Sequence, residues 1–230
     1  MRIASLLVLT LVSCFVSTTA FARAPDTFEE NYTKPALIES PMWMALELKA
    51  GPYVPGDSSA IKDTFGGDKG WMLSTEVDFT LVHIPKVGQF NLGAGFGWAS
   101  YKAKARDENG VKTSEETKLV LYPLSALAVL RIDALARETV IPLTFAGKIG
   151  FESVRWKSTT GDRTDASGFN NGLRWGAQAA FELDWFDRRA ARRMDEEWGV
   201  NHTFLLFEYY DSMTKGTGDR TYQIGVGTQF

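Results

Sequence analysis

Eight stretches of the chain alternate between apolar and polar residues with a period of two. In the clearest, bulky apolar residues from Phe90 to Trp98 alternate with small or polar ones from Asn91 to Ala99. This period is typical of a β-strand with one apolar face. The predicted strands are 43–53, 71–84, 90–99, 117–132, 141–152, 173–185, 203–210 and 221–230. The stretch 117–132 is apolar on both faces and contains Pro123, which predicts a bulge or a local break in its ladder.

The connections between these stretches differ in length and polarity. Those at 54–70, 103–116, 157–172 and 212–219 are long and polar. We expect polar loops at 105–116 and 157–172. Those at 85–88 and 133–138 are short turns. Between the sixth and seventh strands, 187–199 predicts a short helix supported by the pairs Arg192–Glu196 and Arg193–Glu197. Its four arginines favour either a helix lying on an anionic membrane surface or a solvated helical turn.

The residues opposite the bulky apolar faces decide between a barrel in water and a barrel in a membrane. In 90–99 the opposite face is Gly93, Gly95, Gly97 and Ala99, which suits the narrow interior of a small barrel. Glycines would make a poor water-facing surface, because they pack nothing and lose entropy on folding. We therefore predict an all-β fold, an eight-stranded antiparallel up-and-down transmembrane β-barrel with a short helix in one connection. A soluble barrel with an apolar ligand pocket is the alternative.

The charged residues of the strands agree with this orientation. With the bulky set on lipid, ten charged residues point inward as a lumen charge network, whereas on the lipid face a basic residue at mid-bilayer costs about 2–4 kcal/mol. The ten are Glu47, Lys49, Glu76, Asp78, Lys148, Glu152, Arg174, Glu182, Asp184 and Glu208. Seven acids against three bases leave an acidic excess, and Arg131 is a fourth base if the alternation of its strand continues past Pro123.

The N-terminus has the pattern of an exported protein. Arg2, an apolar run and the small residues Ala20 and Ala22 predict a signal peptide over 1–22, followed by an extension at 23–42 and the barrel at 43–230. Lipoprotein cleavage before Cys14 is an alternative. Cys14 is the single cysteine, so removal of the signal leaves no disulfide or thiol. The net charge of −3 argues against nucleic acid as a partner.

At the C-terminus, TYQIGVGTQF resembles the terminal signal strand of Gram-negative outer-membrane barrels, which the barrel assembly machinery reads. The chain from Trp43 to Phe230 resembles the small eight-stranded barrels, such as the OmpA membrane domain, OmpX and OmpW. NHTFLLFEYY, after the RRAARR segment, is similar to an uncharacterised outer-membrane family with a myxobacterial member. The resemblance implies outer-membrane localisation, both termini in the periplasm, the long connections outside the cell, and an assembly signal at Tyr222, Ile224, Val226 and Phe230.

Three functions fit such a barrel. The first is a structural or surface-interaction role for a monomer surrounded by outer-membrane lipids, with an interior filled by side chains. The second is a narrow channel for small cations or solutes, favoured by Glu76, Asp78, Glu182 and Asp184. The third is a lipid-modifying enzyme, although His83 and His202 lie on strands that are not sequential and no family active site carries over. We expect no enzyme, no cofactor and no metal site; the loop pairs Asp63–Asp68 and Asp162–Asp165 match no calcium pattern.

Overall fold

The computed structural model of the chain describes residues 41–53, 70–106, 112–161, 163–218 and 220–230. The expected signal peptide and almost all of the expected extension lie outside these ranges, as do the loop pair Asp63–Asp68 and Asp162.

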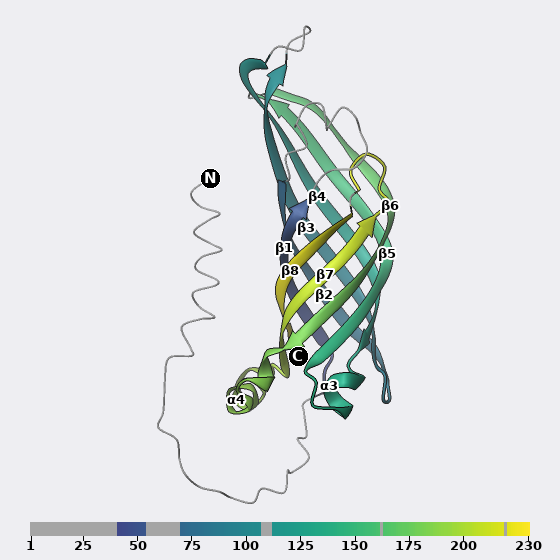
Figure 1. The fold of residues 1–230 in the computed structure, drawn as a ribbon. Helices are drawn as coiled ribbons and strands as arrows, with labels where there is room; N and C mark the ends of the chain where they lie inside the picture. Colours follow the sequence, from purple (N-terminus) through teal and green to yellow (C-terminus); the bar gives the residue numbers. More distant parts are fainter. Residues whose placement is uncertain (1–40, 54–69, 107–111, 162, 219) are drawn as a thin grey trace, which may run out of the picture. The chain divides into compact units, whose positions relative to one another are not determined.

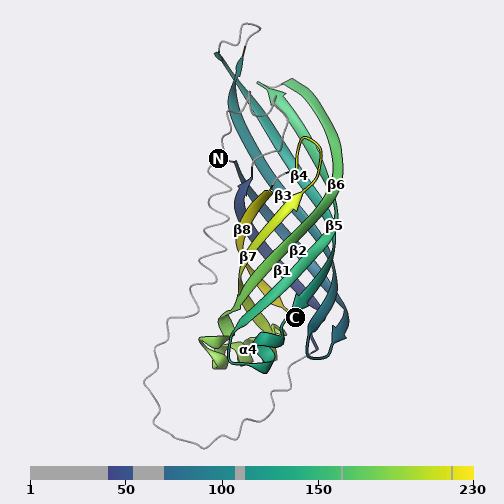
Figure 2. The same ribbon diagram turned by 45° about the vertical axis from the view of Figure 1, so that its right-hand side comes forward.

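Eight antiparallel strands form a closed ring in sequence order (Figure 1). Each strand pairs with the next, and β8 pairs with β1 to close the barrel, which the second view also shows (Figure 2). The predicted fold class is confirmed. The strands are β1 (Met44–Tyr53), β2 (Gly70–Ile84), β3 (Gly88–Arg106), β4 (Lys112–Ile132), β5 (Leu143–Thr160), β6 (Arg163–Glu182), β7 (His202–Ser212) and β8 (Arg220–Gln229).

The helical segments lie at the end of the barrel where β1 begins and β8 ends, which we call the terminus end (Figure 1). They are α3 (Ala134–Glu138), the 3-10 turn η1 (Leu183–Trp185) and α4 (Arg188–Trp198). The Asp187 carboxylate accepts hydrogen bonds from the amides of Arg189 and Ala190, both at 3.0 Å, and Gly199 ends α4 with a φ of 67°. The helix predicted at 187–199 is thus confirmed, while α3 replaces an expected turn. Within the described residues, no helix is long and apolar enough to cross a membrane.

Pro123 interrupts one ladder of β4 without changing its register. Between β3 and β4 the pairs Phe96–Leu124 and Ala99–Leu121 share one register, with no recorded pairs between them. On the other side Pro123 pairs with Val154 of β5. The expected local break is therefore present, without a bulge, because proline lacks the N–H that one ladder needs. The alternation of β4 continues past Pro123.

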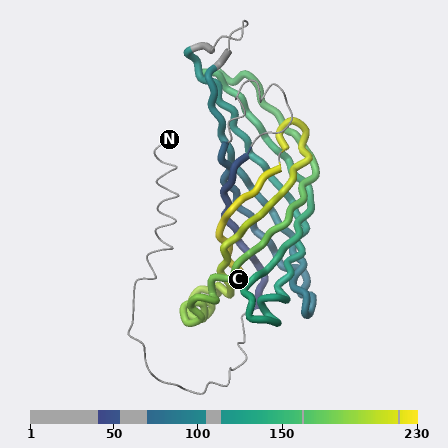
Figure 3. Tube along the Cα trace, viewed as in Figure 1, coloured from purple at the N-terminus to yellow at the C-terminus, as the bar shows by residue number. Residues whose placement is uncertain are grey.

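In two expected loops, 105–116 and 157–172, almost all of the described residues belong to strands, while 107–111 and 162 lie outside the described residues. The segment 157–172 continues β5 and β6 almost to their turn, with pairs such as Lys157–Ser167 and Trp156–Gly168. Likewise β3 extends to Arg106 and β4 starts at Lys112, inside the expected loop 105–116. The long hairpins carry β3 to β6 beyond β1, β7 and β8 at the opposite, distal end (Figure 3). The sequence does not show these strands, because strands with water on both faces lose the apolar–polar alternation but keep their backbone hydrogen bonds.

The outer surface of the ring is apolar. Ile149, Phe151 and Leu92 expose 61%, 71% and 54% of their surface, as the alternation predicted. On β3 the inward Gly93 and Ala99 are buried. The interior holds three apolar clusters besides its charges, a feature that the period-two alternation does not predict. The largest lies toward the distal end and contains Tyr53, Met72, Ala99, Tyr101, Leu119, Leu121, Val154 and Tyr210, and the others contain Leu127, Val129 and Ala146, and Ala180, Phe204 and Leu206.

Candidate functional site

Nine charged side chains converge inside the barrel, and we call them the interior charge cluster. Period-two alternation places every second residue of a strand inside, so pairs such as Glu47 and Lys49 share the inner face. Each of the nine is buried, with at most 6% of its surface exposed. They are Glu47, Lys49, Glu76, Asp78, Arg131, Lys148, Glu152, Arg174 and Glu208.

Two lysines share three carboxylates at the centre of this cluster. The Lys148 Nζ lies 2.8 Å from Glu47 Oε2, 2.5 Å from Glu76 Oε1 and 3.0 Å from Glu208 Oε2. The Lys49 Nζ lies 3.0 Å from Glu47 Oε2 and 2.8 Å from Glu76 Oε2, and it also bonds Glu208. Because an ammonium group has three donors, both groups are fully used. The lysines therefore tie β1, β2, β5 and β7 together across the interior.

The two arginines extend the cluster in different directions. Arg131 Nη2 donates to Glu47 Oε1 at 2.9 Å and to Asp78 Oδ2 at 3.4 Å. Arg174 Nη2 donates to Glu208 Oε1 at 3.0 Å and Nη1 to Glu152 Oε2 at 3.3 Å. The Arg174 guanidinium also lies 4.0 Å from the ring centroid of Tyr210, where a cation is attracted to the aromatic face. Each arginine thus links carboxylates that come from different strands.

The cluster is nearly neutral, unlike the acidic interior that the sequence predicted. Five carboxylates face four cations, because Arg131 points inward as the alternation of β4 continues past Pro123. Asp78 Oδ1 and Arg131 Nε are buried without a hydrogen-bond partner among the described residues.

Glu182 and Asp184 lie outside the interior charge cluster, whereas the other eight predicted lumen residues belong to it. The β6–β7 ladder ends at the pair Glu182–Phe204, and the chain then turns into η1. Asp184 Oδ2 lies 2.8 Å from His202 Nδ1, and its Oδ1 accepts from the Thr203 amide at 3.2 Å. Period-two alternation stops applying where the strand stops, so these residues lie at the terminus end.

Three carboxylates of the cluster, Glu47, Glu76 and Asp78, bring oxygen atoms within 4.8 Å of one another. Such a group could hold a cation. However, Glu47 and Glu76 already bond the two lysine ammonium groups. These ammonium groups take the place that a metal ion would need.

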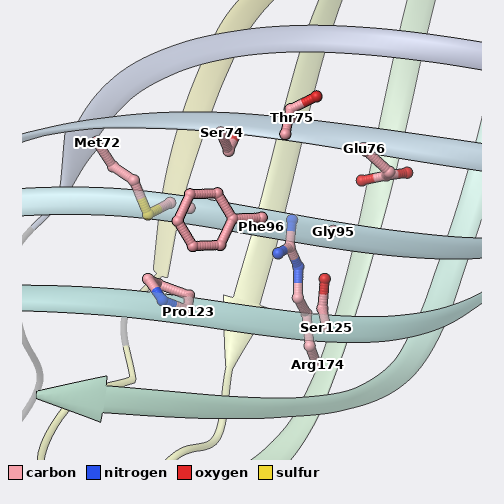
Figure 4. A pocket seen from close by; sticks show the side chains of 10 residues that line it. Met72, Ser74, Thr75, Glu76, Gly95, Phe96, Pro123, Ser125 and Arg174 are labelled. Carbon is pink, nitrogen blue, oxygen red and sulfur yellow. The ribbon is translucent and has the colours of Figure 1, made fainter.

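A cavity of about 10 Å³ adjoins the cluster, which is the volume of about one water molecule. Figure 4 shows its lining, with Met72 at one side and Glu76 at the other. Ser125 Oγ lies in this lining and has no partner among the described residues. The cavity therefore suits a single bound water rather than a substrate.

The two histidines lie on strands that do not pair. His83 is exposed near the end of β2, and His202 begins β7. In the ring, β1 and β8 separate these strands. The structure therefore gives no ground for combining the two histidines in one catalytic site.

The last strand presents its expected assembly residues to the outside. Tyr222, Ile224 and Val226 expose 50%, 55% and 43% of their surface. Phe230 follows the strand and is half-buried. Its carbonyl accepts from the Trp43 amide at 2.7 Å, and its amide donates to the Met44 carbonyl at 2.8 Å. Phe230 therefore extends the seam between β1 and β8.

The terminus end also carries exposed aromatic residues around α4. Trp185, Phe186 and Trp198 expose 52%, 70% and 77% of their surface. The four arginines of α4 are exposed as well. Aromatic and basic residues together are typical of a surface at the membrane–water interface.

A closed ring of eight antiparallel strands, apolar outside and charged inside, defines a small β-barrel of the outer-membrane type. No protein-family model matches the chain, and neither does any curated protein.

Several solved outer-membrane barrels are similar to this chain in structure. Ail, the attachment invasion locus protein of Yersinia pestis, is 12% identical with a TM-score of 0.45, over 82% of this chain and 97% of that one. OprG of Pseudomonas aeruginosa is 11% identical with a TM-score of 0.48, over 84% and 97%. Neisserial surface protein A is 13% identical with a TM-score of 0.43, over 81% and 97%. Likeness at this level carries no inference about function, so the functional argument rests on the chain's own residues.

Proposed function

We propose that this chain is an integral outer-membrane β-barrel protein with a structural or surface-contact role and an interior closed by side chains. The observation that carries the proposal is the inverted distribution of residues in the closed ring. Large apolar side chains such as Phe151 face outward, while charges such as Glu208 and Lys148 are almost completely buried inside. The apolar outer surface is favourable in contact with lipid, and the buried charges in the interior pair with one another.

The proposed orientation places the terminus end in the periplasm and the distal end outside the cell. It is supported by the short connection at the terminus end, where Lys86, with a φ of 62°, turns β2 into β3. At the distal end β3 to β6 extend beyond β1, β7 and β8 and offer a surface for contacts. In this arrangement the protein is a monomer in contact with outer-membrane lipids, inserted by the barrel assembly machinery through Tyr222, Ile224, Val226 and Phe230.

The contents of the interior favour a closed barrel over the alternative of a narrow cation channel. Lys49 and Lys148 each bond three carboxylates, and the apolar cluster around Leu121 lies toward the distal end. Glu182 and Asp184, which would have favoured cations, lie at the terminus end outside the cluster. An ion on this path would have to displace lysines and then cross apolar side chains.

Two measurements on the full chain test the proposal. Outer membranes from cells that express it are run on SDS gels with and without boiling, and a mobility shift in that fraction is the expected result. The purified barrel is then added to a planar bilayer, with a large open porin as the positive control. We expect no conductance steps. A soluble periplasmic protein with one mobility would contradict the membrane assignment, and regular steps would contradict the closed interior.

The enzymatic alternative has its own readout. Mass spectra of the lipids from the same cells should match those of cells without the protein. A new lipid A mass that depends on the protein would contradict the non-catalytic role.

A further inference from the structure

Five basic side chains lie together on the outer face of β3, β4 and β5, toward the distal end. They are Lys102, Lys104, Lys118, Arg155 and Lys157, which we call the basic rim. All five are exposed. They share the outward face with the apolar residues of the same strands, because each lies an even number of residues from an outward-facing neighbour.

The strand register brings the basic rim together in space. Lys102 of β3 pairs directly with Lys118 of β4. On the other side of β4, Val120 pairs with Lys157 and Tyr122 with Arg155. Residues directly opposite or diagonal in neighbouring strands lie within reach of long side chains. The five cations therefore form one continuous patch across three strands.

The basic rim begins where the apolar outer surface ends. On β3, Trp98 is 37% exposed and Lys102 follows four residues later. On β5, Phe151 is 71% exposed and Arg155 follows four residues later. If lipid tails cover the apolar residues, the cations lie at the height of the lipid headgroups.

The local charges of the rim are unbalanced. Glu116 accepts an ion pair from Lys102 at 2.9 Å, and no other carboxylate of the described residues is recorded as paired with the rim. Lys102 and Lys118 oppose each other directly, and like charges in that position repel; Glu116, opposite Lys104, is one anion beside five cations. By contrast Arg220, exposed at the distal end of β8, is paired with Asp211 at 3.0 Å. A simple solvated face would favour such alternating charges.

We propose that the basic rim binds the phosphate groups of anionic lipids in the membrane leaflet at the distal end. The inference rests on the membrane orientation proposed above. Lysine offers a point charge and arginine a bidentate fork to phosphate oxygens. The Arg155 guanidinium carbon lies 5.7 Å from the centroid of the Phe169 ring. A phosphate between Lys102 and Lys118 removes their repulsion, so binding also stabilises the sheet locally.

Native mass spectrometry of the full folded barrel in a neutral detergent tests this inference. The probes are bisphosphorylated lipid A, the same lipid with its phosphates removed, and a soluble sulfated polysaccharide. The variant is the triple substitution Lys102→Gln, Lys118→Gln and Lys157→Gln. The matched control removes three exposed charges outside the rim, at Lys86, Arg163 and Lys215. A gel shift on boiling first establishes that each protein is folded.

We expect the wild type and the control to retain the phosphorylated lipid and the triple variant to lose it. Each cation near an anionic surface contributes about five-fold in affinity, so the triple variant should bind roughly 100-fold more weakly. The dephosphorylated lipid should bind weakly to the wild type, the control and the triple variant. Its affinity for each should not exceed the affinity of the triple variant for the phosphorylated lipid.

Several results would overturn the inference. These are equal binding of both lipids by the wild type, equal loss in the control, or unchanged binding by the triple variant. Binding of the soluble polysaccharide in place of the lipid would assign the rim to a different ligand. In each of these results the barrel is still folded, so the result contradicts phosphate binding by the basic rim and not the proposed function. A barrel that shows no gel shift would contradict the proposed function instead.

Discussion

Replacing Lys148 with methionine tests whether the interior charge cluster is dry. Methionine is unbranched and close to lysine in length, so the change removes the charge with little loss of packing. The Lys148 Nζ lies within 3.0 Å of carboxylate oxygens from Glu47, Glu76 and Glu208. After the substitution these three carboxylates share only Lys49 as a lysine partner, with Arg131 and Arg174 at two of them.

The magnitude follows from burial. The side chains of this group expose at most 2% of their surface, so water cannot screen the charges that remain. Removing one partner of a buried ion pair costs about 3–5 kcal/mol. We therefore expect Lys148→Met to lower the free energy of unfolding by about 3–5 kcal/mol. The urea concentration at the midpoint of unfolding should fall in proportion to this loss of free energy.

The control is Lys102→Met. Lys102 pairs with Glu116, but their side chains are 51% and 53% exposed. Exposed pairs contribute about 0–1 kcal/mol, so this variant should unfold almost like the wild type. Both are measured in zwitterionic phosphatidylcholine vesicles, by tryptophan fluorescence and by the gel shift.

A second substitution separates charge from packing. Glu76 bonds both lysines, so Glu76→Gln in the Lys148→Met background removes one uncompensated carboxylate. The double variant should be more stable than the sum of the single effects by about 0.5–3 kcal/mol. If Lys148→Met costs no more than Lys102→Met, the interior is wet, and the argument for a closed barrel fails.

Three further predictions concern the outer face, the barrel seam and α4. Ile224 is 55% exposed on the outer face, so Ile224→Arg should cost about 2–4 kcal/mol of folding free energy or block assembly, while Ile224→Leu should be tolerated. Equal outcomes for the two variants would contradict the lipid-facing assignment of Ile224. Gly225→Ala should destabilise the seam between β1 and β8 by about 1–3 kcal/mol, since the new Cβ would lie 2.1 Å from the Leu48 carbonyl oxygen. The control Gly147→Ala places its Cβ where nothing lies within 4 Å, so it should leave the free energy of unfolding in a urea titration unchanged. Replacing the four arginines of α4 with glutamine should lower stability in anionic vesicles and not in zwitterionic ones; unchanged stability in both would mean a solvated helix.

The sequence predicted the strands and their faces well where opposite environments meet across the sheet. Between Phe90 and Ala99 every bulky apolar residue faces outward and every glycine inward, because lipid and a narrow interior make opposite demands on size. The hairpin at 157–172 has no strand pattern in its side chains, since water lies on both of its faces. The ladder pair Lys157–Ser167 depends on backbone groups that all residues share.

The candidate site could be predicted in composition but not in connectivity. Alternation identifies Glu47 and Lys148 as inward residues, but their meeting across the ring depends on register and strand tilt, which a single sequence does not encode visibly. The sequence does not separate Asp184 from the cluster, because it continues the alternation past the last ladder pair, Glu182–Phe204. Leu127 and Val129 were missed as interior residues because β4 is apolar on both faces.

The interior charge cluster also bears on why the barrel adopts one register. A slip of two residues keeps every side chain on its own face, so an apolar outer surface in lipid gains almost the same from either register. The interior does not, because Lys49 and Lys148 meet Glu47, Glu76 and Glu208 only when β1, β2, β5 and β7 are aligned as observed. A slip would leave buried charges without partners, which costs far more than the outer face could recover. The cluster therefore selects the register that the lipid-facing residues leave undetermined.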